Sequence, residues 1–231
     1  TMSTADSIDG GTGGADVFNI FTSGAAPAIP QMANIETVNI YDLDSDFATA
    51  DFGADVTAVN LVRGDGGLTL TVGGSVGTIG LTDLDVAAGN LGLTTTATAT
   101  SLDLNLSAVT GGTGDDIVLT GAALASSTIT ATTASAAGAI NVAGASAVTV
   151  VATGNLTLAD GIATTATAGT LTVSGAGNAD LSALDAGFTT VTASGLSGAL
   201  TAEIGGADDM VLTGGTGNDV ITANTTDALS A

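Results

Sequence analysis

The chain has 231 residues, enough for one large domain or for two of about a hundred residues each. Its 23 acidic residues against one basic residue, Arg63, give a formal net charge of −22, which excludes nucleic acid as a partner because a phosphate backbone requires a basic surface. The absence of Cys and His excludes disulfides, thiol chemistry and the common zinc ligand sets. No apolar run reaches the roughly 18 residues of a membrane-spanning helix, so we expect no membrane insertion.

A glycine-rich string near the start, residues 10–18 (GGTGGADVF), approximates the calcium pattern G-G-x-G-x-D-x-U-x, in which U is a large apolar residue. One residue is inserted before its aspartate. Closely spaced glycines allow sharp turns that aim carbonyl oxygens inward, and the aspartate adds a carboxylate. The calcium ligands expected here are Gly11, Gly13 and Asp16, with Asp9 as a further candidate.

An acidic run at residues 42–55 begins like an EF-hand loop. Such a loop needs glycine at its sixth position and a bidentate acid at its twelfth, but Phe47 and Gly53 stand there, so an EF-hand is rejected. Two interpretations stay open, an irregular calcium site and a solvated acidic loop. The candidate ligands of the irregular site are Asp42, Asp44 and Asp46.

Two short strings resemble functional motifs without predicting an activity. Residues 73–77 fit the serine-hydrolase pattern G-x-S-x-G, but the catalytic triad needs a histidine and the chain has none. Arg63 stands in an Arg-Gly-Asp string, where it either pairs with Asp65 or another acid or is an exposed charge. Since one arginine is also too little to bind an acidic polysaccharide substrate, we expect no enzymatic activity.

Short β-prone runs separated by Gly, Asn and Asp occupy most of the remaining chain. Apolar residues alternate with Thr, Asp or Asn, which is the period-two pattern of half-buried strands, and little helix is expected. Many short strands fit either a parallel β-helix (β-solenoid) or antiparallel β-sandwich modules. Because the tight-hairpin dipeptide Asn-Gly is absent and the turns are rich in glycine, we favour the all-β solenoid.

Two strings fit the calcium pattern completely, residues 111–119 (GGTGDDIVL) and 214–222 (GGTGNDVIT), and residues 205–213 (GGADDMVLT) form a copy that is one residue short. We expect Asp116 and Asp219 to face an ion, while Val118 and Ile221 start strands and point into a core. The other expected ligands are Gly112, Gly114, Gly206, Asp208, Asp209, Gly215 and Gly217, with Asp115 and Asn218 as further candidates.

The spacing of the copies predicts two modules. The first, residues 1–110, is a calcium-binding β module with the N-terminal turn, and the second, residues 111–222, ends in the tandem turns. Residues 223–231 form a tail or the start of a next module. Calcium bound at the motifs would then join the modules at their boundaries.

The nonapeptides resemble those of RTX (repeats-in-toxin) proteins. The Ala-, Thr-, Gly- and Val-rich sequence between them, including residues 34–40 (NIETVNI), resembles calcium-binding bacterial surface-layer proteins and related large secreted adhesins. This resemblance implies type I secretion, folding when the chain meets calcium outside the cell, and parallel β-rolls or β-helices. RTX toxins stack many nonapeptides in tandem, whereas here the tandem segment is limited to residues 205–222.

Charge and resemblance together predict a Ca²⁺-dependent structural protein of the bacterial cell surface or extracellular matrix. Its expected partners are further copies of itself, in a surface layer, filament or matrix, and cell-surface polysaccharide held through calcium. The alternative is an adhesin or biofilm-matrix segment that binds glycans or another surface. Because residues 1–10 lack the basic and apolar regions of a signal peptide, we expect a segment of a longer secreted chain.

Overall fold

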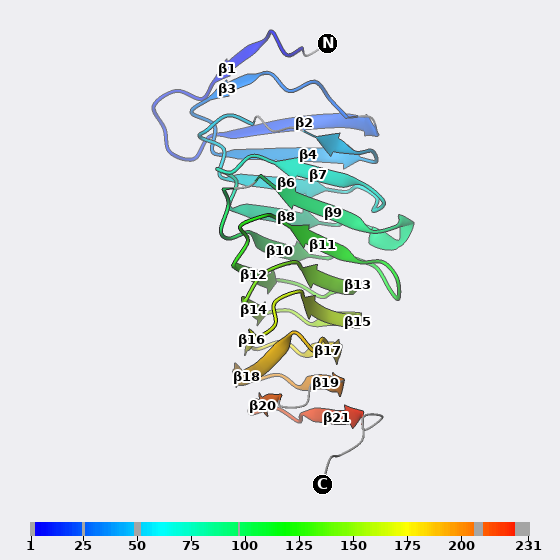
Figure 1. Cartoon of the computed structure of the whole chain (residues 1–231). Coiled ribbons are helices and arrows are strands. Elements are labelled where there is room, and N and C mark those ends of the chain that lie inside the picture. The colour runs from blue at the N-terminus through cyan, green and yellow to red at the C-terminus, as the bar shows by residue number, and fades with distance from the viewer. Residues whose placement is uncertain (1–2, 25, 49–51, 97, 206–209, 225–231) are drawn as a thin grey trace.

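The structure is a computed structural model, and it describes residues 3–24, 26–48, 52–96, 98–205 and 210–224. The chain winds into a parallel β-solenoid, in which each coil adds one strand to each of two facing sheets (Figure 1). Neighbouring strands within both sheets run parallel over the described residues. The predicted all-β solenoid is therefore confirmed, and the antiparallel sandwich is not adopted.

The first sheet contains the even-numbered strands in chain order. They are β2 (Val17–Gly24), β4 (Thr37–Leu43), β6 (Ala58–Val62), β8 (Thr78–Thr82), β10 (Asp103–Ser107), β12 (Ser126–Ala131), β14 (Ala147–Ala152), β16 (Gly169–Gly175), β18 (Phe188–Leu196) and β20 (Val211–Thr213).

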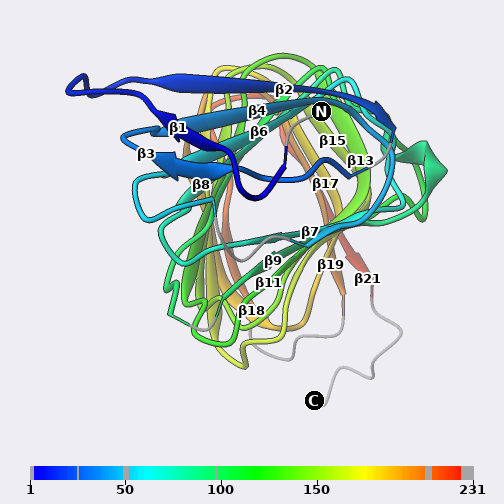
Figure 2. The ribbon, with the colours of Figure 1, turned by 90° about the horizontal axis from the view of Figure 1, so that it is seen from above.

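The second sheet contains the odd-numbered strands from β5 onward and faces the first across the core (Figure 2). They are β5 (Phe47–Ala48), β7 (Thr69–Val72), β9 (Leu91–Thr95), β11 (Ile117–Thr120), β13 (Ser135–Val142), β15 (Leu156–Thr164), β17 (Ala179–Leu184), β19 (Leu200–Gly205) and β21 (Val220–Asn224). At the N-terminal end a small third sheet pairs β1 (Ser7–Asp9) with β3 (Gln31–Ala33).

Helix is limited, among the described residues, to one 3₁₀ turn at Val86–Ala88. Asp85 caps this turn by accepting a hydrogen bond from the amide of Ala87. In the described part of the chain no helix has the length and apolar character needed to cross a bilayer.

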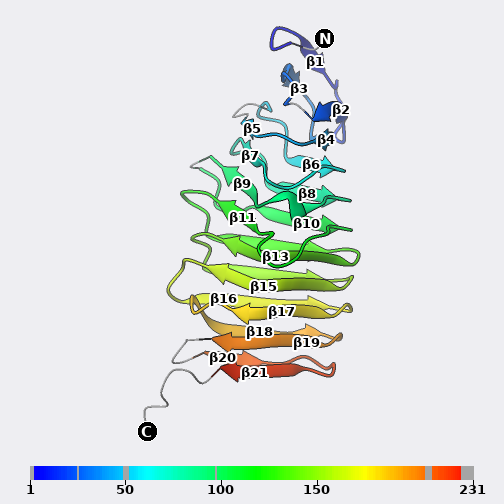
Figure 3. The same cartoon turned by 90° about the vertical axis from the view of Figure 1, so that its right-hand side faces the viewer.

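The repeating unit is one coil, which is much shorter than the predicted modules. Along the first sheet, Val59 lies beside Ile79, 20 residues later, and Ile79 lies beside Leu104, 25 residues later. Figure 3 shows these coils stacked as successive rungs. The second sheet continues past residue 110, because β11 pairs with β9 on one side and with β13 on the other. The division into modules 1–110 and 111–222 stays a prediction about folding units.

Columns of buried aliphatic side chains fill the space between the sheets. Alternate residues of each strand point inward, and the register between coils places equivalent residues above one another. One such column from the first sheet consists of Val38, Val59, Ile79, Leu104, Ile129, Val150 and Val173, all buried.

The core narrows along the axis. A second inward column begins with Ile20, Ile40, Leu61, Leu81 and Leu106 and continues with the smaller Ala131 and Ala152. In this column, large side chains therefore give way to small ones toward the C-terminal coils. Figure 1 shows the coils becoming narrower toward the C-terminal end.

One corner of the solenoid holds a row of residues in the left-handed backbone conformation. It lies at or directly after the C-terminal ends of β4, β6, β8 and β10, and its members are Asp42 (φ 58°), Arg63 (φ 53°), Asp83 (φ 51°) and Ala108 (φ 54°). Each such non-glycine residue costs about 1–2 kcal/mol in backbone energy. The same strained conformation recurs in four successive coils, because each coil must turn at this corner to stay stacked on its neighbours.

Candidate calcium-binding turns

The turn between β1 and β2 folds closely around its own aspartate. A Cβ at Gly13 would lie 3.0 Å from Oδ2 of Asp16, and a Cβ at Gly10 would lie 2.8 Å from the Cβ of Asp16. In the next coil, Oε2 of Glu36 accepts a hydrogen bond from the amide of Asp16 (2.8 Å). Oδ2 of Asp16 is buried and has no hydrogen-bond partner among the described residues. Because burying an unpaired carboxylate oxygen is costly, a cation at this oxygen would compensate it.

Beside this turn, polar side chains connect three successive coils. The side-chain amide of Asn34 donates to Oδ1 of Asp9 (2.8 Å), and the backbone amide of Asn34 donates to Oδ2 of Asp55 (3.0 Å). The amide of Gly11 also donates to Oδ1 of Asp9 (2.9 Å). The hydrogen bond from Asn34, and then that from Gly11, lowers the pKa of Asp9 because both stabilise the charged carboxylate.

Replacing Asn34 by glycine is expected to raise the pKa of Asp9 toward its ordinary value. Glycine suits the backbone here, since Asn34 has a φ of 53°. A lowered folded-state pKa contributes stability above the unfolded pKa that is lost as the pH falls through the folded pKa, so Asn34→Gly should reduce this acid-dependent loss. Carboxyl-carbon NMR titration measures the pKa directly, and the same value for Asp9 in both proteins would contradict the assignment.

The turn at residues 111–116 is held by hydrogen bonds to acidic side chains. Oδ2 of Asp115 accepts from the amide of Gly112 (2.8 Å), and Oδ1 of Asp116 accepts from the amide of Ala139 in the next coil (2.8 Å). Asp160, one coil further, accepts from the amide of Gly114 (2.5 Å). Asp160 therefore joins this turn from a distant part of the sequence.

In the strand after this turn, the residues that face the core are the ones predicted to face outward, and the reverse. Ile117 and Leu119 are fully buried, and Ile117 stands in register between Leu91 and Ile140 of the neighbouring coils. Val118 alternates with these residues and is only partly buried. The prediction that Val118 points into the core is wrong, because packing against two flanking coils fixes the phase of the strand.

The turn at residues 214–219 closes on Asp219. Oδ2 of Asp219 accepts from the amide of Gly215 (2.7 Å), and Oδ1 accepts from the amide of Leu200 in the preceding coil (2.9 Å). A Cβ at Gly217 would overlap the carbonyl oxygen of Gly198. The close approach continues along a column of corner glycines, Gly154, Gly177, Gly198 and Gly217. The glycine and aspartate of this string thus both support the backbone of the turn.

The two complete copies differ in their orientation toward the core. Ile221 is in register with buried Ala202 and so faces inward, as predicted, although it is 43% exposed in the last described strand. The equivalent residue of the other copy, Val118, lies on the outward side. Asp116 and Asp219 therefore start strands of opposite phase, and matching sequences do not make these two turns equivalent sites.

The remaining candidates are dispersed. Asp42 pairs with Arg63 (3.3 Å), so of the predicted alternatives, Asp65 or another acid, Arg63 uses another acid, from the preceding coil. Oδ1 of Asp46 accepts from the amide of Thr69 (2.8 Å), and Asp44 is exposed. Asn218, at the last turn, is also exposed. Three predicted ligands lie outside the described residues, namely Gly206, Asp208 and Asp209.

Within the residues that the structure describes, no three acidic side chains gather closely enough to hold a metal ion by themselves. Calcium also accepts carbonyl oxygens and water, so one or two carboxylates can complete a site. Among the described turns, the first offers such an ion a buried, unpaired carboxylate oxygen, Oδ2 of Asp16, with the carboxylate of Glu36 bound to the same residue's amide. Comparison of the chain with protein-family models, curated proteins and solved structures gives no match.

Glu36 and Asp160 contact the candidate turns but were not among the residues predicted from the sequence. A signal for Glu36 was present, since residues 19–21 (NIF), 39–41 (NIY) and 60–62 (NLV) recur at intervals of one coil. Aligning these triplets brings residue 16 beside residue 36. Asp160 has no comparable signal, because its position depends on irregular pairing within β15.

Proposed function

We propose that the chain is a calcium-stabilised structural segment of an extracellular bacterial protein that assembles with copies of itself into a surface layer, filament or matrix. The observation that carries the proposal is the buried, unpartnered Oδ2 of Asp16 in a glycine-rich turn, in which the Glu36 carboxylate accepts a hydrogen bond from the Asp16 amide. The net charge of −22 adds support, because bound cations would reduce the self-repulsion of the compact chain. A stack of parallel coils also makes a rod suited to such a role.

Calcium is expected to raise the stability of the purified chain. Extracellular calcium modules have Kd values of about 10⁻⁴ to 10⁻³ M, so their sites fill outside the cell. A ligand at a hundredfold excess over its Kd stabilises the fold by about 2.7 kcal/mol per site, which corresponds to an increase in Tm of roughly 5–10 °C for a chain of this size. Thermal unfolding followed by far-UV circular dichroism, with calcium and with EDTA, measures the difference.

Matched variants assign the effect to the first turn. Asp16→Asn and Glu36→Gln should each reduce the calcium-dependent rise in Tm. Asp185→Asn is the control, because it makes the same charge change at another turn, where the Asp185 carboxylate accepts a hydrogen bond from the amide of Gly187. This variant should show the same calcium-dependent rise in Tm as the wild type. Equal Tm values for the wild type in calcium and in EDTA would contradict the calcium proposal.

Electron microscopy should show sheets or fibres only with calcium, and a monomeric chain under both conditions would contradict the assembly proposal.

An adhesin or matrix segment is the second candidate function. It is favoured by one observation, an exposed Phe21 ring stacked on Tyr41, on a chain with few aromatic residues. An adhesin would stay monomeric and bind another surface, so microscopy and binding experiments separate the two functions.

A further inference from the structure

The outward face of the first three strands of the first sheet combines several kinds of side chain in aligned columns. Residues two apart on a strand share a face, and register places equivalent residues of β2, β4 and β6 side by side. We call this surface the N-terminal platform. Its columns are Asn19, Asn39 and Asn60, then Phe21, Tyr41 and Val62, with Asp42 and Arg63 at the adjoining corner.

The first ring of the platform's aromatic column is unusually exposed. The Phe21 side chain is 71% exposed, whereas Phe47, Phe52 and Phe188 are buried in the core. The Phe21 and Tyr41 rings stack with centroids 4.6 Å apart and planes inclined by 15°. A phenylalanine left this exposed gains little burial in the fold, and an exposed apolar patch, unlike a single scattered residue, commonly marks a binding site.

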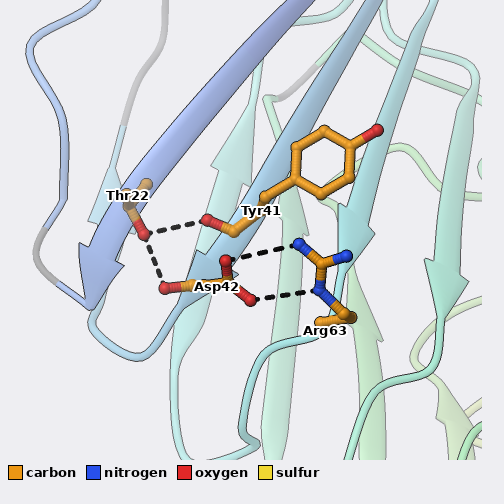
Figure 4. A network of polar contacts seen from close by, with 4 residues as sticks. All are labelled: Thr22, Tyr41, Asp42 and Arg63. Carbon is orange, nitrogen blue, oxygen red and sulfur yellow. Dashed lines mark hydrogen bonds and ion pairs between the residues drawn. The ribbon is translucent and has the colours of Figure 1, made fainter.

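A pair of charged groups borders the aromatic column. Figure 4 shows Arg63 facing Asp42, with Nε of Arg63 at 3.3 Å from Oδ1 of Asp42. The guanidinium carbon of Arg63 lies 5.3 Å from the centroid of the Tyr41 ring. Both charged side chains remain about half exposed, at 55% and 50%. An exposed ion pair contributes little to stability because water screens it, but it places donors and acceptors beside the rings.

The ladder of asparagines supplies further polar groups on the other side of the rings. The side-chain amide of Asn39 donates to Oδ1 of Asn19 (2.8 Å), and that of Asn60 donates to Oδ1 of Asn39 (2.7 Å). These bonds fix the orientation of the side chains. A side-chain amide has two N–H donors and two acceptor lone pairs, so the ladder leaves capacity for hydrogen bonds to a ligand.

We propose that the N-terminal platform binds a neutral polysaccharide. The apolar face of a sugar ring can stack on the exposed Phe21 ring, which Tyr41 supports from its other face, while its hydroxyls exchange hydrogen bonds with the asparagine amides and with Asp42 and Arg63. Acidic polysaccharides are disfavoured, because the chain carries a net charge of −22 and its single basic residue is already paired. This site is separate from the calcium turns and does not rest on calcium-dependent assembly; it specifies a ligand for the second candidate function, the adhesin.

Binding is tested by sedimentation with insoluble cellulose and chitin and by titration with soluble galactomannan and amylose, with alginate as the acidic comparator. The chain has one tyrosine and no tryptophan, so its intrinsic emission reports directly on Tyr41. We expect at least one of the neutral polysaccharides to deplete the protein or change the tyrosine emission, and alginate to do neither. The neutral polysaccharides are measured in calcium and alginate in calcium-free buffer, because calcium gels alginate and would bridge its carboxylates to the acidic chain. Folding is checked by circular dichroism in both buffers, so that the calcium proposal can fail without affecting this test.

Phe21→Ala and Tyr41→Ala are each expected to weaken polysaccharide binding at least tenfold while leaving the far-UV spectrum unchanged. Val211→Ala is the matched control, because it removes a 63% exposed apolar side chain from the far end of the same sheet, and it should bind as the wild type does. Failure of all four neutral polysaccharides to bind, binding of alginate alone, or wild-type binding by both aromatic variants would overturn the proposal. A change in oligomeric state without a change in binding would identify the platform as a self-association surface and would also overturn it.

Discussion

Gly161→Ala is expected to destabilise the solenoid by about 3 kcal/mol or more. Gly161 has a φ of 93°, a conformation that costs a residue with a side chain about 1–3 kcal/mol. Its Cβ would also overlap the carbonyl oxygen of Ala183 in the next coil, and overpacking against a rigid backbone adds about 1–3 kcal/mol. Both costs fall on the middle of the second sheet, where β13, β15 and β17 pair. Urea unfolding followed by circular dichroism measures the loss as a lower midpoint.

Gly77→Ala provides the matched control for Gly161→Ala. A Cβ at Gly77 would meet no atom within 4 Å, and the backbone hydrogen bond from its amide to the carbonyl of Thr57 would remain. At a compatible position, glycine to alanine is neutral or stabilises by about 0.4–1 kcal/mol through the unfolded state. Equal urea midpoints for the two variants would show that the close contact between coils at Gly161 is absent.

Leu104→Ala is expected to cost about 2–5 kcal/mol, the usual range for a fully buried leucine. Leu104 stands in the inward column between Ile79 and Ile129, near the middle of the stack, so the cavity cannot be filled from an open end. Because each coil contacts only its neighbours, a central defect should also weaken the coupling between the two halves. Hydrogen exchange should therefore show earlier opening of β8, β10 and β12 than in the wild type.

Asn105→Ala tests whether burial, and not position along the chain, causes this effect. Asn105 neighbours Leu104 on the same strand but points outward and is exposed. Its substitution should change the free energy of unfolding by no more than about 0.5 kcal/mol. If both variants lost similar stability, the inward column would not be the main support of the central coils.

The solenoid could be predicted from local patterns, whereas its coil length could not be read from the calcium motifs. Alternation such as Leu102 to Leu106 requires half-buried strands, and glycine-rich turns suit stacking. The motifs at residues 111 and 214 suggested a repeat of about a hundred residues, yet the physical repeat is set by inward columns of interchangeable aliphatic residues. Val, Ile and Leu substitute freely for one another in such a column, so the spacing of one coil is hard to recognise in the sequence.

The candidate site was predicted less completely than the fold. Asp16 and its glycines could be identified from the motif, but its neighbour Glu36 depends on knowing which coil lies next to which. The predicted inward orientation of Val118 was wrong for a related reason, since one motif cannot specify how a strand packs between two others. The N-terminal platform was missed because Phe21, Tyr41 and Arg63 meet only after three coils are stacked.

The parallel stacking of coils also determines how the molecule would respond to tension. The first and last described strands lie at opposite ends of the axis (Figure 1), so a pull between these ends loads the hydrogen bonds between coils one row at a time. Each detached coil of 20 residues would release about 70 Å of extended chain. Under load the rod would therefore lengthen by peeling at low, nearly constant force, and would dissipate energy without breaking as a single unit.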